Sequence, residues 1–172
     1  RAREAGASVH GALCAALLLA TAETAYATEL AAHTPTTVGC FTALNLRPQL
    51  TPPVGEGLGL YMSQVTTFHR IVPRPPLWQL AREVKEKLQA TLATGEQYLT
   101  MPLIGLLIPW RTPPGPAFIR RFDGGSPAAL GVSNLARPPI PRCYGPLTIE
   151  DLHLAVGVSV VGQLMGQATT WE

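Results

Sequence analysis

The pattern of hydrophobic and polar positions along the chain predicts two long helices. Residues 9–22 are apolar on nearly every side, so they are expected to form a helix buried in a layer, with Ser8 as its N-cap. A second helix is predicted after Pro75 and Pro76, and Gly95 is expected to end it. One side of this second helix carries apolar residues at helical spacing, namely Leu77, Leu80, Ala81, Val84, Leu88 and Leu92. This side is expected to face a sheet.

Segments rich in β-branched and aromatic residues predict the strands of that sheet. They cover residues 37–46, 59–72, 130–135, 147–156 and 163–171. A short buried helix is predicted between Pro102 and Pro109, and the Pro- and Gly-rich residues 111–127 are expected to form a long surface loop. The order is helix, two strands, helix, short helix and three strands. It predicts an α/β layered sandwich with a mixed sheet covered by helices on at least one face.

The composition allows a single domain with a sizeable core. Of 172 residues, 47% are hydrophobic and only 14% are charged, where about 25% charged residues would be ordinary. Either some apolar surface is covered by polypeptide absent from this chain, or the protein is simply rich in Ala and Leu. The chain begins without Met and stops at Trp171-Glu172 inside a predicted strand. We therefore expect residues 1–172 to be truncated at both ends.

Charge and cysteine usage argue against several classes of protein. The net charge is +2 and Arg120-Arg121 is the sole adjacent basic pair, so no nucleic-acid partner is expected. The apolar segment 11–22 is too short for the ~20 residues of a membrane helix, and no signal peptide is recognisable. Cys14, Cys40 and Cys143 are widely spaced and odd in number, which predicts neither a disulfide framework nor a metal site. The pattern favours a reducing, cytoplasmic location.

Common catalytic motifs are absent from the sequence. None of the four histidines has a neighbouring His or an Asp four residues later, so a structural or surface role is predicted for His10, His33, His69 and His153. The segment 131–135 (Gly-Val-Ser-Asn-Leu) lacks the second Gly of a serine-hydrolase elbow. The Gly-rich segment 55–59 precedes a predicted strand, whereas a dinucleotide-binding loop precedes a helix. The residues alone predict no catalytic centre.

Several segments in order nevertheless resemble one family. Residues 6–13 resemble the pattern G-x-S/T-V-x-x-A-L, and residues 45–53 (Asn-Leu-Arg-Pro-Gln-Leu-Thr-Pro-Pro) resemble D/N-L-R-P-x-L-x-P-P. Residues 77–82 (Leu-Trp-Gln-Leu-Ala-Arg) and 132–135 (Val-Ser-Asn-Leu) are similar to a W-x-L-A-R helix and a v-S-N-l-G strand. Together they resemble the polyketide-associated acyltransferases typified by phthiocerol dimycocerosyl transferase. This family belongs to the condensation-domain and chloramphenicol-acetyltransferase-like superfamily.

The resemblance implies that residues 1–172 are the C-terminal lobe of a two-lobe acyltransferase with a tunnel between its lobes. The family's catalytic signature, His-His-x-x-x-Asp-Gly, lies in the N-terminal lobe, where a His is the general base toward the acceptor. Nothing in this chain matches that signature, so the chain alone is expected to be inactive. The implied reaction, in lipid or polyketide biosynthesis, transfers an acyl group to a small-molecule or lipid alcohol, or to an amine. The donor would be an acyl-CoA or a phosphopantetheinyl acyl-carrier protein, with no permanently bound cofactor.

Three residues are candidates for substrate binding under this resemblance. Ser133 and Asn134 would donate hydrogen bonds to an oxyanion in the tunnel, or else only satisfy hydrogen bonds of their strand. Arg47 would contact a phosphate of CoA or of the carrier's phosphopantetheine. Alternatively, its side chain would only stabilise the turn in which it lies. Ala136 stands where the family usually has Gly, and a side chain at this position would restrict a close approach of the backbone.

An alternative function is a non-catalytic lobe that binds a carrier protein or a partner lobe. Arg120 and Arg121, in the predicted long loop, would suit the acidic surface of a carrier protein. A loop that is merely solvated explains the same two residues.

Overall fold

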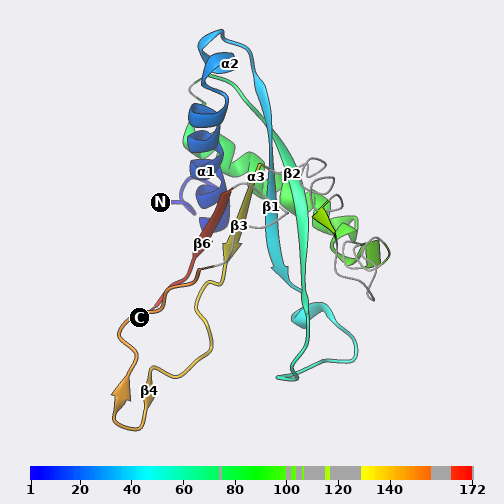
Figure 1. The fold of residues 1–172 in the computed structure, drawn as a ribbon, viewed down its shortest axis with the longest axis vertical. Helices are drawn as coiled ribbons and strands as arrows, with labels where there is room; N and C mark the ends of the chain where they lie inside the picture. The colour runs from blue at the N-terminus through cyan, green and yellow to red at the C-terminus, as the bar shows by residue number, and fades with distance from the viewer. Residues whose placement is uncertain are drawn as a thin grey trace.

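The computed structural model describes residues 1–73, 75–99, 102–103, 106, 115–116, 129–155 and 164–171. Within these residues the main sheet has four strands in the order β2–β1–β3–β6 (Figure 1). They are β1 (Thr36–Asn45), β2 (Met62–Ile71), β3 (Leu130–Asn134) and β6 (Leu164–Ala168). The β1–β2 pair is antiparallel, whereas β1–β3 and β3–β6 are parallel. The predicted mixed sheet is therefore confirmed.

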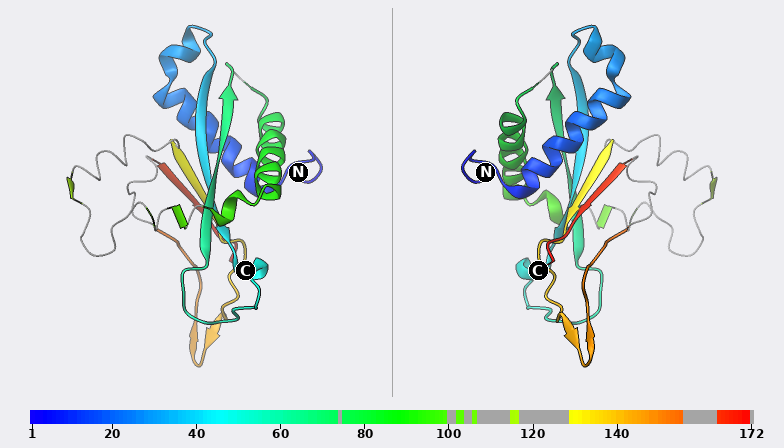
Figure 2. Two further views of the ribbon diagram at one scale, coloured as in Figure 1. Left: turned by 90° about the vertical axis from the view of Figure 1, so that its right-hand side faces the viewer. Right: turned by 90° about the vertical axis from the view of Figure 1, so that its left-hand side faces the viewer.

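Two long helices pack against this sheet and against each other (Figure 2). They are α1 (Val9–Ala25) and α3 (Leu77–Ala93). The Ser8 hydroxyl accepts a 2.9 Å hydrogen bond from the Gly11 amide, which confirms Ser8 as the N-cap of α1. Gly95 follows α3 with a φ of +78°, in the left-handed region that favours glycine. Both helices contribute to one core, which includes Cys14, Leu18, Val38, Cys40, Ile71, Leu80, Val84, Leu130 and Val132.

Helix α1 was expected to be buried in a layer because it is apolar on nearly every side, but it is buried along one stripe only. Its buried residues form one stripe, namely Gly11, Cys14, Ala15, Leu18, Thr21 and Ala22. Val9 is 62% exposed, and Leu13, Leu17 and Leu19 are only partly buried. The reason is that the sheet and α3 together cover one side of this helix. A uniformly apolar helix gives no indication of which side that will be.

Helices α1 and α3 approach each other closely at Gly11. A Cβ atom on Gly11 would lie 2.6 Å from the Ala81 carbonyl oxygen, so a larger residue would push the helices apart. Hydrogen bonds from α3 also hold the residues before α1. The Arg82 guanidinium donates to the Ala5 carbonyl at 2.8 Å, and the Lys85 ammonium donates to the Gly6 carbonyl at 2.9 Å.

Strand β2 shows the alternation that its sequence predicts. Its inward positions are buried, namely Ser63, Val65, Thr67, His69 and Ile71. The buried His69 ring has a partner at each nitrogen: Nε2 lies 2.9 Å from the Thr67 hydroxyl, and Nδ1 lies 3.2 Å from Glu83 Oε1. Glu83 also pairs with Lys87 at 2.7 Å. His69 therefore has the structural role that was predicted for it.

The C-terminal third differs from the predicted arrangement. Residues 147–156 were predicted to form one strand, but the described part of this segment contains only β5 (Leu147–Thr148). This two-residue strand pairs with β4 (Cys143–Tyr144) in a hairpin around Gly145, whose φ is +60°. The hairpin projects away from the main sheet (Figure 1). Because no longer strand lies alongside, the alternating residues that follow form no ladder, and His153 lies outside any strand.

Smaller elements complete the described chain. They are α2 (Ala27–Ala31), η1 (Arg47–Gln49) and η2 (Glu96–Tyr98). None of the three was predicted, because each is a single turn or little more and lacks a periodic pattern. The predicted short helix between Pro102 and Pro109 and the predicted loop 111–127 lie largely outside the described residues.

The inward face of α3 provides a test of the layered fold. Leu80 is 3% exposed in the core, whereas Glu86 lies on the outer side of the same helix. We expect Leu80→Ala to lower the free energy of unfolding by about 2–5 kcal/mol. Glu86→Ala should change it by about 0.5 kcal/mol or less. Urea unfolding measures both, and similar small effects would contradict the described packing.

The buried His69 makes stability depend on pH. Burial lowers the pKa of His69, and the hydrogen bond to Glu83 only partly offsets this effect. In the unfolded chain the imidazole takes up a proton near its ordinary pKa of about 6.5. The neutral, buried His69 therefore contributes fully to the stability of the fold above about pH 6.5. This contribution is lost as the pH falls below about 6.5, because the unfolded chain then binds the proton more readily than the folded chain. Urea unfolding at pH 7.5 and at pH 5.5 should show that the free energy of unfolding falls more between these two pH values in the wild type than in His69→Gln. Equal losses would show that His69 is not the group responsible.

Candidate functional site

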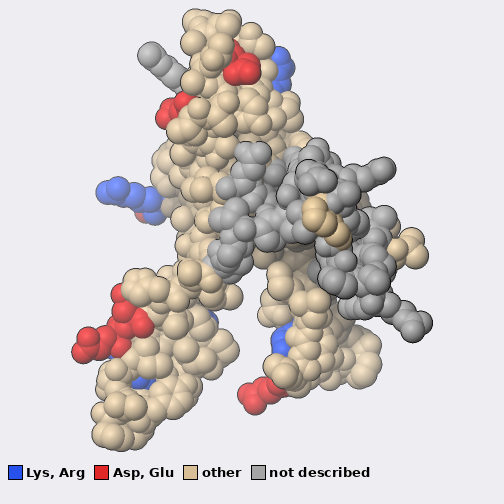
Figure 3. All heavy atoms as spheres, viewed as in Figure 1, with Lys and Arg blue, Asp and Glu red and all other residues tan. Residues whose placement is uncertain are grey.

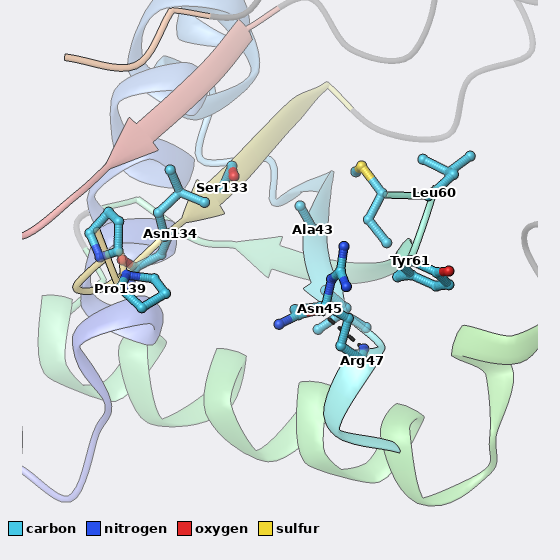
Figure 4. A pocket seen from close by; sticks show the side chains of 13 residues that line it. Ala43, Asn45, Arg47, Leu60, Tyr61, Ser133, Asn134 and Pro139 are labelled. Carbon is cyan, nitrogen blue, oxygen red and sulfur yellow. Dashed lines mark hydrogen bonds between the residues drawn. The ribbon is translucent and has the colours of Figure 1, made fainter. Parts of the chain in front are cut away.

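A cavity of about 500 Å³ opens at the carboxyl ends of the parallel strands β1 and β3 (Figure 4). The carboxyl ends of parallel strands are where open α/β sheets commonly bind ligands. Its wall comes from the end of β1, the start of β2 and the segment after β3. The lining residues are Ala43, Leu44, Asn45, Arg47, Gly59, Leu60, Tyr61, Met62, Ser133, Asn134, Leu135, Pro138 and Pro139. All three residues singled out from the sequence, Arg47, Ser133 and Asn134, are brought together here.

Ser133 and Asn134 bring unused hydrogen-bond donors to this cavity. The Ser133 hydroxyl has no hydrogen-bond partner within the part of the chain that the structure describes. The Asn134 side-chain oxygen accepts a 2.9 Å bond from the Ala136 amide, and its NH₂ group has no partner among the described residues. Both residues line the cavity, and Asn134 also lines a second cavity next to it. Neither side chain is used by the hydrogen bonds of the sheet itself.

Arg47 also lines the cavity, but its guanidinium is engaged by its own loop. Its Nη1 donates to the Gly55 carbonyl at 2.6 Å, and its Nη2 donates to the Gly57 carbonyl at 3.0 Å. The guanidinium also lies 4.4 Å from the centre of the Tyr61 ring, in a cation–π contact. These contacts support the second of the two roles considered for Arg47, which is to hold the loop between β1 and β2. A phosphate contact of Arg47 stays a prediction.

A second cavity of about 330 Å³ adjoins the first and shares Ala43, Leu44 and Asn134 with it. The remaining lining residues come mainly from α1 and α3, namely Ser8, His10, Thr42, Lys85, Leu88, Gln89 and Leu92. His10 Nε2 lies 3.0 Å from the Thr42 hydroxyl and 3.3 Å from Cys14 Sγ. Sequence reasoning gave His10 a structural or surface role and did not place it at a cavity. The available signal was the Ser8 cap, which puts His10 in the first turn of α1.

The other charged candidates take no part in the described cavities. His153 Nε2 lies 2.8 Å from Asp151 Oδ2 on the exposed surface. Arg120 and Arg121 lie outside the described residues. Throughout the described ranges, no group of three or more His, Cys, Asp or Glu side chains is arranged to hold a metal ion. No helix in the same ranges has both the length and the apolar character needed to cross a membrane.

Comparison with protein families identifies the chain. A family described as "Phthiocerol/phthiodiolone dimycocerosyl transferase C-terminus" matches residues 1–170. The chain belongs to this family. The family resemblance that the sequence motifs indicated is thereby confirmed. No curated protein matches the sequence.

A solved structure has the same fold as this chain. The chain is similar to polyketide synthase associated protein 5 from Mycobacterium tuberculosis, with a TM-score of 0.62 and 22% sequence identity. The match covers 99% of this chain and 39% of that protein's chain. The chain thus spans well under half the length of its structural relative. The likeness confirms the predicted fold class, one α/β lobe of the chloramphenicol-acetyltransferase-like type.

The backbone conformation at Ala136 accounts for the glycine that the family resemblance led us to expect after Ser-Asn-Leu. Ala136 occupies that position with a φ of +51°, in the left-handed region. Its amide is bonded to the Asn134 side chain, and its carbonyl accepts a 2.6 Å hydrogen bond from the Thr170 amide. These two bonds hold Ala136 in a conformation that an L-residue with a Cβ adopts at a cost of about 1–2 kcal/mol.

Replacing Ala136 by glycine should therefore stabilise the domain. Relief of the left-handed strain outweighs the larger conformational entropy of glycine in the unfolded chain, which leaves a net gain of about 0.5–1 kcal/mol. The matched control is Ala90→Gly on the exposed side of α3, which should lose about 1 kcal/mol. Urea unfolding of both variants measures the two signs. A loss of stability in Ala136→Gly would contradict the left-handed geometry.

Proposed function

We propose that this domain lines the acyl-donor site of an acyltransferase and that Ser133 and Asn134 stabilise the charge that develops during transfer. The donor is an acyl-CoA or an acyl-carrier protein, and the acceptor is an alcohol or an amine. The observation that carries the proposal is the pair of donors at the 500 Å³ cavity, which have no partner among the described residues, in a chain of the dimycocerosyl transferase C-terminus family. Neither donor is among the buried side-chain atoms that lack a partner, so both are accessible from the cavity and can donate to a ligand there.

The wall of the cavity suits an acyl chain. Leu60 is 71% exposed, and Met62 and Leu135 are also exposed beside the two donors. The loop between β1 and β2, which supplies Leu60, projects at the lower right of the space-filling view and carries few charged side chains (Figure 3). An apolar wall with a small number of polar groups is the usual composition of a small-molecule site. Here the apolar part would hold the chain, and the polar part would hold the carbonyl.

The proposed chemistry is the attack of an acceptor hydroxyl or amine on the thioester carbonyl. The new C–O or C–N bond forms while the carbonyl oxygen becomes an oxyanion, which Ser133 Oγ–H and the Asn134 NH₂ group would stabilise. The C–S bond then breaks, and the proton from the acceptor passes through a base to the leaving thiolate. Removing one preorganised donor of this kind commonly costs about 10²–10³-fold in kcat.

The general base is proposed to come from the other lobe of the enzyme. His10 lies at the adjoining cavity, but its Nε2 faces Thr42 and Cys14, and no carboxylate in the described residues contacts its ring. A base of the His-Asp type therefore fits an N-terminal lobe better than this one. The alternative function, binding of a carrier protein or a partner lobe without catalysis, depends on Arg120 and Arg121. Both residues lie outside the described part of the chain.

The test uses a polypeptide that joins this domain to an N-terminal lobe carrying the His-His-x-x-x-Asp-Gly signature. We expect Ser133→Ala and Asn134→Ala each to lower kcat with acyl-CoA donors by about 10–10³-fold. The matched control is Gln79→Ala, an exposed amide on α3 that touches neither cavity. If both variants keep the wild-type melting temperature and the wild-type kcat, the proposed stabilising role is wrong.

A further inference from the structure

The second cavity carries a positive charge that its wall does not neutralise. Lys85 is the only Lys, Arg, Asp or Glu among its described lining residues. The half-buried Lys85 ammonium donates a 2.9 Å hydrogen bond to the Gly6 carbonyl and pairs with no carboxylate in the described part of the chain. Glu83, which also lies on α3, is already paired with Lys87 at 2.7 Å. The ammonium therefore keeps N–H donors for a ligand, because one carbonyl uses only one of them.

Further hydrogen-bond donors surround the same cavity. Gln89 follows Lys85 by about one turn of α3, so both side chains lie on one side of the helix. The side-chain amide of Gln89 and the NH₂ group of Asn134 have no partner among the described residues. The Ser8 hydroxyl accepts from the Gly11 amide and keeps its own proton to donate. Several donors beside a cation suit an oxyanion such as a carboxylate or a phosphate.

The second cavity lies directly beside the proposed centre of acyl transfer. Asn134, whose NH₂ group is proposed to stabilise the developing oxyanion, lines both cavities. The second cavity has a volume of about 330 Å³, and a sphere of that volume is about 9 Å across. An anionic group bound at Lys85 therefore lies within reach of a small molecule whose other end is at the reacting carbonyl.

The phosphate of the acyl donor does not fit this position. In CoA and in a carrier's phosphopantetheine, the arm between the thioester and the phosphate is about as long as four extended residues, or roughly 14 Å. With the thioester at Asn134, an extended arm of that length places the phosphate beyond the second cavity. The acceptor is the other reactant that must lie beside the thioester. An anionic group in this cavity therefore belongs to the acceptor.

We propose that the second cavity is the acceptor subsite and that Lys85 selects an acceptor with a carboxylate or a phosphate group near its hydroxyl or amine. This inference rests on the proposed acyl transfer at Ser133 and Asn134. The hydroxyl or amine attacks the thioester carbon, the C–S bond breaks, and the acceptor's proton passes through the base to the leaving thiolate. The anionic group stays unreacted at Lys85, where Gln89 donates to its other oxygen.

The acceptor preference is measured in the polypeptide that joins this domain to an N-terminal lobe, with one acyl-CoA as the donor. The acceptors are 4-hydroxybutanoate and its uncharged methyl ester, and glycerol 3-phosphate and glycerol form a second pair. The KM of the charged member should be about 10–100-fold lower in at least one pair, as expected for a charge-assisted hydrogen bond. The pair with the larger ratio distinguishes a carboxylate from a phosphate. Lys85→Met should abolish the preference by raising the KM of the charged acceptor, and Lys85→Arg should restore most of it.

Arg82→Met is the matched control for this substitution. Arg82 donates to the Ala5 carbonyl at 2.8 Å, much as Lys85 donates to Gly6, but it lines neither cavity. Its loss removes a similar bond to the segment before α1, so both acceptor KM values should stay unchanged. The proposal is overturned if the wild type has no preference or if Lys85→Met changes both KM values equally. The same selective change in Arg82→Met would also overturn it.

A binding measurement separates failure of this inference from failure of the proposed function. The melting temperature of the same polypeptide is recorded in sodium phosphate and in sodium chloride of equal ionic strength. Phosphate should raise it more in the wild type than in Lys85→Met, because a ligand that binds the folded state stabilises that state. If this difference is found but Ser133→Ala and Asn134→Ala keep the wild-type kcat, the proposed function is wrong and the acceptor assignment falls with it, while the anion site stands. If kcat falls in those variants but phosphate stabilises Lys85→Met as much as the wild type, the anion site is wrong and the transfer centre stands.

Discussion

Strand β1 is paired on both of its edges, and the rest of the molecule depends on that pairing. On one edge it is bonded antiparallel to β2 from Thr36↔Ile71 to Asn45↔Met62, and on the other it is parallel to β3. The buried central position fixes which side chains face the helices. Cys40 and Thr42 lie on the side of β1 that faces α1. His10 and Cys14, which are one helical turn apart on α1, lie on the facing side of that helix. The parallel pairing also aligns the ends of β1 and β3, so that Asn45, Ser133 and Asn134 meet at one cavity.

The sequence predicted the elements that carry a strong periodic pattern. The stripe on α3 and the alternation on β2 repeat over many residues. Of the stripe, however, only Leu80, Ala81 and Val84 are buried, while Leu77 is exposed, because α3 packs on α1 as well as on the sheet. The sequence pattern gave a wrong prediction where the structure of a segment depends on which other elements pack against it. Residues 147–156 alternate weakly, but strand formation needs a partner, and the described chain offers only β4. Likewise, α1 is apolar on all sides, so its sequence could not indicate that Val9 would face solvent.

The candidate site was only partly predictable for a related physical reason. Ser133, Asn134 and Arg47 were found through a family resemblance, and the fold places all three at one cavity. Which of these side chains already has hydrogen-bond partners depends on contacts in the folded chain, and here Arg47 differs from the other two. Arg47 donates to Gly55 and Gly57, whereas the donors of Ser133 and Asn134 have no partner among the described residues.

The segment after β3 shows how strain and site geometry are related in this domain. Asn134 uses its side-chain oxygen to hold the Ala136 amide, and this bond turns the chain away from the sheet just beyond the cavity. The same bond orients the amide plane of Asn134 and so positions its NH₂ group, which has no other partner among the described residues. A glycine at position 136 would adopt the left-handed φ with less strain, yet the bond to Asn134 would be unchanged. Ala136→Gly should thus raise stability while leaving ligand hydrogen bonding by Asn134 intact, whereas Asn134→Ala would remove both the turn and the donor. The two substitutions separate the conformational role of this segment from its proposed role in binding.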